Sequence, residues 1–138
     1  MNARAAAAGA TAALVWAAAE PLDQRILGCD YSDTALLGKA VSRRYWQPVG
    51  LAMHALNGAA FGLTFDLVRR WTGLQPVPLA VGMAVTENTV LWPLCVFVDR
   101  YHPARGEPGL PALARNGRAF AQATWRHALF GAVLGRLA

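Results

Sequence analysis

The chain has few charged residues for its length. Only 15% of its 138 residues are Asp, Glu, Lys or Arg, whereas about a quarter are charged in a typical soluble domain. Hydrophobic residues make up 55% of the chain. This balance argues against an ordinary water-exposed surface and is typical of an integral-membrane protein, which we expect to form a single domain over residues 1–138.

Cysteine is also scarce. Cys29 lies in a polar segment and Cys95 in an apolar run, and neither belongs to a Cys-x-x-Cys pair. We therefore expect no disulfide between them.

Basic residues are present, but they do not form a nucleic-acid-binding pattern. The net charge is +5, yet no basic helix or stripe of aromatic and basic residues accompanies it. In so hydrophobic a chain, arginines more often flank membrane spans. We expect no nucleic-acid partner, and we expect the lipid bilayer to surround the protein.

Four apolar segments are candidates for transmembrane helices. They cover residues 5–19, 48–68, 77–98 and 116–137. The last three contain the roughly 20 residues that a bilayer core requires, and Pro93 is expected to kink the third. The first segment also has features of a signal peptide, but we interpret it as a span because it carries the beginning of an internal repeat.

The first long loop is expected to contain a short helix. Ser32 and Asp33 can cap a helix that runs through Val41. It is amphipathic and is followed by Tyr45 and Trp46, as helices at a membrane interface often are. The sequence thus predicts an all-α membrane bundle with four transmembrane helices and an interfacial helix.

A motif occurs twice in the chain. Residues 54–62 and 127–135 both have the pattern His-Ala-Leu-x-Gly-x-x-x-Gly. Asp23 follows Trp16 at the distance at which Asp99 follows Trp92. We interpret the chain as two tandem two-helix repeats, approximately residues 1–70 and 71–138, related by a pseudo-two-fold axis along the membrane normal.

The glycines of this motif favour close helix packing. Gly58 and Gly62 share one helical face, as do Gly131 and Gly135. If the two faces meet, they bring the two histidines together across the pseudo-axis. They could instead form the interface of a homo-oligomer.

Four spans would place both termini on one side of the membrane. The loops 20–47 and 99–115, taken with Arg118, hold twice as many Lys and Arg residues as the opposite side. The positive-inside rule then places these loops in the cytoplasm and the termini outside. We expect the cytoplasmic membrane of a bacterium as the location.

Polar residues within the predicted spans are the candidates for function. Glu87 and Arg126 lie near the middle of their helices, and such residues usually face the bundle interior and mark a site. They could pair with each other, or Glu87 could bond to Asn57. The candidate catalytic residues are Glu87, His54 and His127, and the candidate ligand-binding residues are Asn57, Asn88, Arg126, Trp16 and Trp92.

The two histidines allow several kinds of chemistry. Histidines on facing helices could ligate a haem, or His54, His127 and Glu87 could bind a metal ion. They could also act as bases. The ordinary alternative is a hydrogen bond from each histidine to a neighbouring helix.

A second candidate site lies in the loops. Asp30 and Asp33 form an Asp-x-x-Asp motif, and Asp99 with His102 is expected on the same side of the membrane. Carboxylates so placed could hold Mg²⁺ against a lipid diphosphate. Helix caps and turns also explain acidic residues at such positions.

The leading hypothesis is therefore a small membrane protein with an intramembrane site for a metal, a haem or a lipophilic substrate, with acid–base chemistry at Glu87 and a histidine. The alternatives are a non-catalytic assembly or accessory subunit, and a small transporter, in which the polar residues only hold the helices together.

Overall fold

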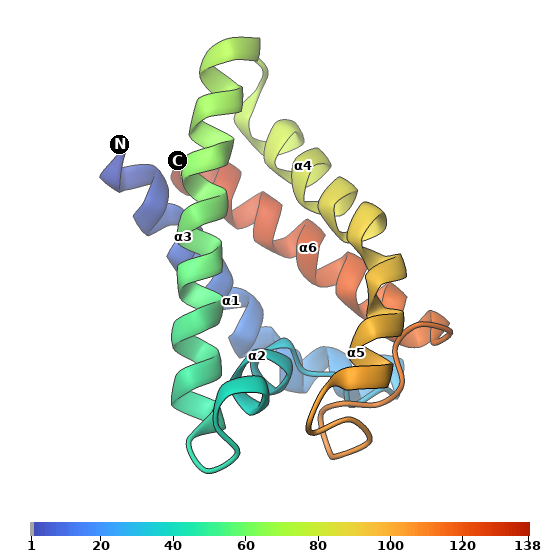
Figure 1. The fold of residues 1–138 in the computed structure, drawn as a ribbon. Helices are drawn as coiled ribbons and strands as arrows, with labels where there is room; N and C mark the ends of the chain where they lie inside the picture. Colours follow the sequence, from blue (N-terminus) through green and yellow to red (C-terminus); the bar gives the residue numbers. More distant parts are fainter. Residues whose placement is uncertain (1) are drawn as a thin grey trace.

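The computed structural model describes residues 2–138, and these residues are all-helical, as predicted (Figure 1). The helices, in chain order, are α1 (Ala3–Leu27), α2 (Asp33–Val41), α3 (Trp46–Thr72), α4 (Pro76–Leu91), the short 3₁₀ helix η1 (Trp92–Leu94), α5 (Cys95–Tyr101) and α6 (Gly117–Leu137).

Three stretches of helix are long and apolar enough to cross a membrane: Ala3–Leu27, Trp46–Thr72 and Pro76–Tyr101. The prediction of four spans is therefore wrong for its fourth member, α6. Polar residues lower the hydropathy of α6, and two of them, Gln122 and Arg126, are fully buried. Because α6 packs against α1 and α4, its polar face is turned to protein, and the apolar helices shield it.

The helix ends differ from the prediction in two places. Helix α1 continues through Pro21 to Leu27 and ends at Gly28, whose φ of 62° is left-handed, whereas the predicted span stopped at residue 19. A proline removes only one backbone donor, and the packing of the following turns on α6 outweighs this loss. Pro93 does interrupt the third span, as predicted, but helix resumes in α5, so Asp99 is helical and not part of a loop.

Glycines set the close packing of two helix pairs. A methyl group at Gly9 of α1 would overlap the carbonyl oxygen of Gly58 in α3. In the other half of the chain, a methyl group at Gly131 of α6 would lie 2.5 Å from the Cα of Val81 in α4. Each glycine face thus packs against a helix of its own half of the chain, and the two faces do not meet each other. A homo-oligomer through these glycines remains a prediction, although the single chain already covers them.

The two chain termini and the two long loops lie at opposite ends of the bundle. At one end, the guanidinium of Arg4 donates to the carbonyl of Leu137 at 3.3 Å, and Asn2 donates to Asp66 at 2.9 Å. The two termini and the α3–α4 turn therefore gather there (Figure 1). At the other end the two long loops pack together, and Lys39 of α2 donates to the carbonyl of Pro108 at 2.8 Å.

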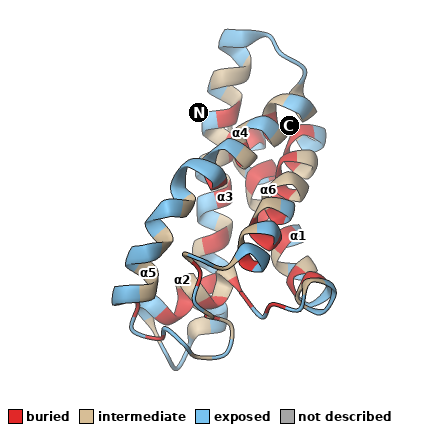
Figure 2. Ribbon diagram, turned by 90° about the vertical axis from the view of Figure 1, so that its right-hand side faces the viewer, coloured by how far each residue is buried: buried red, intermediate tan, exposed pale blue. Residues whose placement is uncertain are grey.

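Helix α2 forms where the sequence predicts it. The hydroxyl of Ser32 accepts a hydrogen bond from the backbone N–H of Ala35 at 3.1 Å, which is the usual helix cap. One face of α2 packs against α3. Its place at a membrane interface stays a prediction. In Figure 2 many residues of α6 are buried, while α5 is largely exposed.

Candidate functional site

Arg126 of α6 is the centre of a buried polar cluster. Its side chain is 0% exposed. It donates from Nε and Nη2 to the two carboxylate oxygens of Asp23, at 2.7 and 2.6 Å, and from Nη1 to Asp33 at 2.9 Å. Glu20 lies 3.7 Å from the same guanidinium. The predicted Glu87–Arg126 pair is therefore wrong, because acids of α1 and the first residue of α2 surround the guanidinium in place of Glu87.

Two further residues complete the cluster. Gln122, one turn before Arg126, donates to Asp23 at 2.6 Å and to the carbonyl of Cys29 at 3.1 Å. The hydroxyl of Tyr31 donates to Asp33 at 2.5 Å. Burial, together with the neighbouring Asp33 charge, raises the pKa of Tyr31 well above its ordinary value, so the phenol stays protonated and keeps donating.

Trp16 links this cluster to the two histidines. Its indole N–H donates to Asp33 at 3.1 Å. The rings of His54 and His127 both contact this indole edge-on, with centroid distances of 4.9 and 4.5 Å. The structure thus brings together Trp16, His54 and His127, from three different helices, although the two glycine faces do not meet.

A cavity of about 600 Å³ lies beside this group. Its walls come from α1, α2, α3, α4 and α6. They combine aromatic rings with polar groups; the aromatic residues are Trp16, Phe61 and Phe130, and the polar residues include Asp33, His54, Asn57, Glu87 and His127. Such a mixture of apolar walls and a few polar groups is typical of small-molecule sites.

No protein-family model, curated protein or solved structure matches this chain. Its function is therefore inferred from the chemistry of the cavity.

The hydrogen bond of His127 fixes which of its ring nitrogens can act as an acceptor. Its Nδ1 lies 2.7 Å from the carbonyl oxygen of Ala123. A carbonyl only accepts hydrogen bonds, so Nδ1 carries the proton and Nε2 of the neutral ring is an acceptor. His127 can therefore accept a hydrogen bond or a proton at Nε2.

His54 has an unsatisfied nitrogen. The residue is only 7% exposed, and within residues 2–138 its Nε2 has no hydrogen-bond partner. Leaving a buried polar atom unpaired costs about 1–3 kcal/mol. A group from outside the chain would remove this cost.

Glu87 lies at the rim of the cavity and not in the bundle interior, where such a residue was expected. It is exposed, and it makes no salt bridge to any other described residue. Its neighbour Asn88 is buried and donates to Thr124 at 3.0 Å, which ties α4 to α6. Trp92 packs on Phe120 at 5.2 Å. Neither Asn88 nor Trp92 lines the cavity.

The predicted metal ligands do not converge. No group of three or more His, Cys, Asp or Glu side chains within residues 2–138 is close enough to hold a metal ion. Trp16 lies against both histidines, and Glu87 lies at the rim. The described residues thus offer no site with three such ligands for a metal ion.

The loop residues bind backbone groups. Asp99 accepts hydrogen bonds from the N–H groups of Leu113 and Ala114, at 2.8 and 2.9 Å. His102 donates from Nε2 to the carbonyl of Leu36 at 2.9 Å and accepts at Nδ1 from Ala104. These bonds hold the second long loop against α2 and α5.

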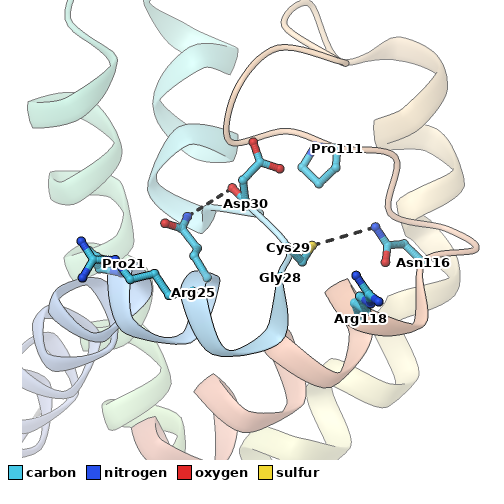
Figure 3. A pocket seen from close by; sticks show the side chains of 9 residues that line it. Pro21, Arg25, Gly28, Cys29, Asp30, Pro111, Asn116 and Arg118 are labelled. Carbon is cyan, nitrogen blue, oxygen red and sulfur yellow. Dashed lines mark hydrogen bonds between the residues drawn. The ribbon is translucent and has the colours of Figure 1, made fainter.

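Asp30 has a similar role beside a surface hollow. Its carboxylate accepts from the N–H of Gly109 at 2.9 Å. Its carbonyl accepts a hydrogen bond from Gln24 at 3.1 Å, and the amide of Asn116 approaches the sulfur of Cys29 (Figure 3). Asp30, Asp33 and Asp99 thus serve separate purposes, and the proposed Mg²⁺ site in the loops is not assembled among them.

Sequence reasoning missed three members of the cluster, Glu20, Tyr31 and Gln122, and it noted Asp23 without linking it to Arg126. One signal was available, because Gln122 and Arg126 are four residues apart and so share one face of a helix. That face could have been recognised as buried. Glu20 and Asp23 gave no such signal, because Pro21 between them suggested a helix end.

Proposed function

We propose that this protein binds a lipophilic molecule within the membrane and holds the polar end of that molecule between His54 and His127, against Trp16. The observation that carries the proposal is the buried, unpaired Nε2 of His54 beside a cavity of about 600 Å³. Parts of the cavity wall come from three helices that are long and apolar enough to cross a membrane, which supports a ligand taken from the lipid.

The polar end of the ligand should donate hydrogen bonds. Nε2 of the neutral His127 is an acceptor, and Glu87 offers a carboxylate at the rim. A hydroxyl or an amine fits these partners better than a carboxylic acid or a phosphate, which would bring negative charge next to Glu87. His127 Nε2 is also the atom that would take a proton from the ligand if proton transfer occurs.

We propose that the two long loops lie on the cytoplasmic side of a bacterial membrane and that the start of α1 lies on the other side, an arrangement that three crossings, by α1, α3 and the stretch Pro76–Tyr101, allow. The gathering of the loops at one end and of the termini at the other supports it. The similar glycine packing of α1 on α3 and of α4 on α6 supports a duplication of a two-helix unit.

The test is to purify the protein in detergent, extract it with organic solvent and identify the released molecules by mass spectrometry. We expect a lipophilic alcohol or amine in near-stoichiometric amount from the wild type, and its loss from His54→Ala and His127→Ala. Leu56→Ala, which alters an exposed residue of the same helix as His54, is the control and should retain the molecule.

A second candidate function, an accessory subunit without a ligand, is favoured by the Arg126 cluster, whose hydrogen bonds are made within the chain. It predicts that both histidine variants behave like the wild type in every assay. That result would replace the binding proposal with the structural one.

A further inference from the structure

A second, more apolar hollow lies between α3 and α4. It has a volume of about 950 Å³. Most of its wall is apolar and comes from α4, including Leu79, Gly82, Met83, Val90 and Leu91. We call this hollow the α3–α4 groove.

The groove is continuous with the histidine cavity. Phe61 and Glu87 line both of them. Helices α3 and α4 diverge from the turn that joins them (Figure 1) and make few contacts with each other. The space between these helices thus runs from an apolar outer wall to polar groups in the interior.

We propose that the ligand is a single-chain amphiphile with a protonated amine, which enters from the lipid between α3 and α4, leaves its hydrocarbon chain in the α3–α4 groove and places its amine beside Glu87 and the histidines. This inference rests on the proposed function, because it assumes that the cavity binds the polar end of a lipophilic molecule. It adds the route by which the ligand enters, the position of its hydrocarbon chain and the charge of its polar end.

The charges around the cavity favour a cation. Glu87 has no cationic partner among the described residues. Behind the cavity, one arginine faces three carboxylates, those of Glu20, Asp23 and Asp33. The rings of Trp16, Phe61 and Phe130 add aromatic faces, which attract cations.

The apolar groove explains why a long chain is expected. Each buried methylene adds about 0.8 kcal/mol to binding, but only if the chain lies against the protein while the head is held. Glu87 stands at the junction of the two hollows, so it can meet the amine while the chain follows α4 toward Leu79 and Gly82.

Gly82 provides a way to fill the groove without disturbing the fold. No atom lies within 4 Å of the place that a Cβ would take there. Leucine is also a better helix former than glycine, so Gly82→Leu should fold at least as well as the wild type. Thr89→Leu adds a leucine at an exposed position of the same helix outside the groove, and it serves as the control.

The experiment is native mass spectrometry of the purified protein in maltoside micelles, with tetradecylamine, tetradecanol, tetradecanoic acid and butylamine as probes. We expect tetradecylamine to bind the wild type more tightly than the alcohol or the acid of equal length. Gly82→Leu should weaken its binding about 10-fold, the effect of losing roughly two buried methylenes. Butylamine should bind the wild type and Gly82→Leu equally, and Thr89→Leu should match the wild type.

The outcomes separate this inference from the proposed function. If His54→Ala abolishes tetradecylamine binding but Gly82→Leu leaves it unchanged, the histidine site stands and the α3–α4 groove is not the place of the chain. If tetradecanol binds as tightly as tetradecylamine, the head is not recognised as a cation. If His54→Ala and His127→Ala bind all probes like the wild type, the proposed function itself fails.

Discussion

Arg126 and Asp23 form a two-point ion pair in the interior of the bundle, with Nε and Nη2 donating to Oδ2 and Oδ1 at 2.7 and 2.6 Å. The parallel geometry is the strongest that an arginine and a carboxylate adopt. The pair joins the last turns of α1 to the middle of α6, two segments that are far apart in the sequence. Because Arg126 also bonds to Asp33 and to the carbonyl of Tyr31, this one side chain connects three separate segments.

Removing the guanidinium should therefore leave buried carboxylates without a partner. We expect Arg126→Gln to lower the free energy of unfolding by about 3–5 kcal/mol, as loss of one partner of a buried pair usually does. Thermal unfolding of the protein in detergent, followed by circular dichroism, measures the change. Arg25→Gln is the matched control, since Arg25 is exposed, and a wild-type melting temperature for Arg126→Gln would contradict the role of the pair.

Tyr31 should make the stability of the protein depend on pH in the alkaline range. Burial and the Asp33 charge raise the pKa of the folded-state phenol, so its stabilising effect is fully present below the unfolded-state pKa of about 10 and is lost as the pH rises above it. We expect Tyr31→Phe to lose part of this dependence and to be less stable than the wild type at neutral pH, because its hydrogen bond to Asp33 is gone.

The measurement is chemical unfolding of the wild type and Tyr31→Phe between about pH 8 and 11, the range that brackets an ordinary tyrosine pKa. The difference in stability between the two proteins should shrink as the pH rises. Tyr101→Phe, at an exposed position, is the control. A difference that stays constant over this range would show that ionisation of Tyr31 does not couple to folding.

Gly58 and Gly131 should tolerate no side chain. A methyl group at either position would lie within 2.7 Å of atoms of the facing helix, several of them backbone atoms, which cannot move aside as a flexible side chain can. We expect Gly58→Ala and Gly131→Ala each to destabilise the bundle by at least about 1–3 kcal/mol, the usual effect of overpacking. Gly82→Ala should be neutral or stabilising in the same thermal assay, and equal stability of all three variants would contradict the close packing.

Trp16 should matter to both stability and binding. Its indole donates to Asp33 and contacts both histidines, so Trp16→Phe removes one buried hydrogen bond and alters the wall of the cavity. The lost bond should cost about 1–3 kcal/mol. Trp125→Phe, at an exposed position of α6, should cost much less. The result that would count against this role is a Trp16→Phe protein that retains its ligand and its melting temperature.

The sequence predicted much of the architecture because local rules govern it. Apolar runs marked three helices that are long and apolar enough to cross a membrane, Ser32 marked the start of α2, and Pro93 marked the break between α4 and α5. These features depend on the residue itself and its nearest neighbours. Which face of a helix is buried depends instead on the helices that pack against it, and these can be distant in the sequence.

For that reason the interior of the site was harder to predict. Arg126 was recognised as out of place, but its partners depend on how far α1 continues past Pro21 and on how α6 is rotated. Glu87 was expected inside the bundle because of its depth along α4, yet it is exposed, where the cavity meets the α3–α4 groove. The depth of a residue along a helix can be read from the nearby sequence. The direction in which that residue faces depends on the rotation of the helix, which is set by packing against other helices.

The most direct test of the account is nitrogen NMR of the protein with ¹⁵N-labelled histidine, which has only His54, His102 and His127. At a pH where the rings are neutral, His127 should carry its proton on Nδ1 and His102 on Nε2, because their carbonyl partners face those atoms. Addition of tetradecylamine should shift the Nε2 signals of His54 and His127 and leave His102 unchanged. Unchanged signals from His54 and His127 at saturating amine, or equal shifts at all three histidines, would contradict a ligand site between His54 and His127.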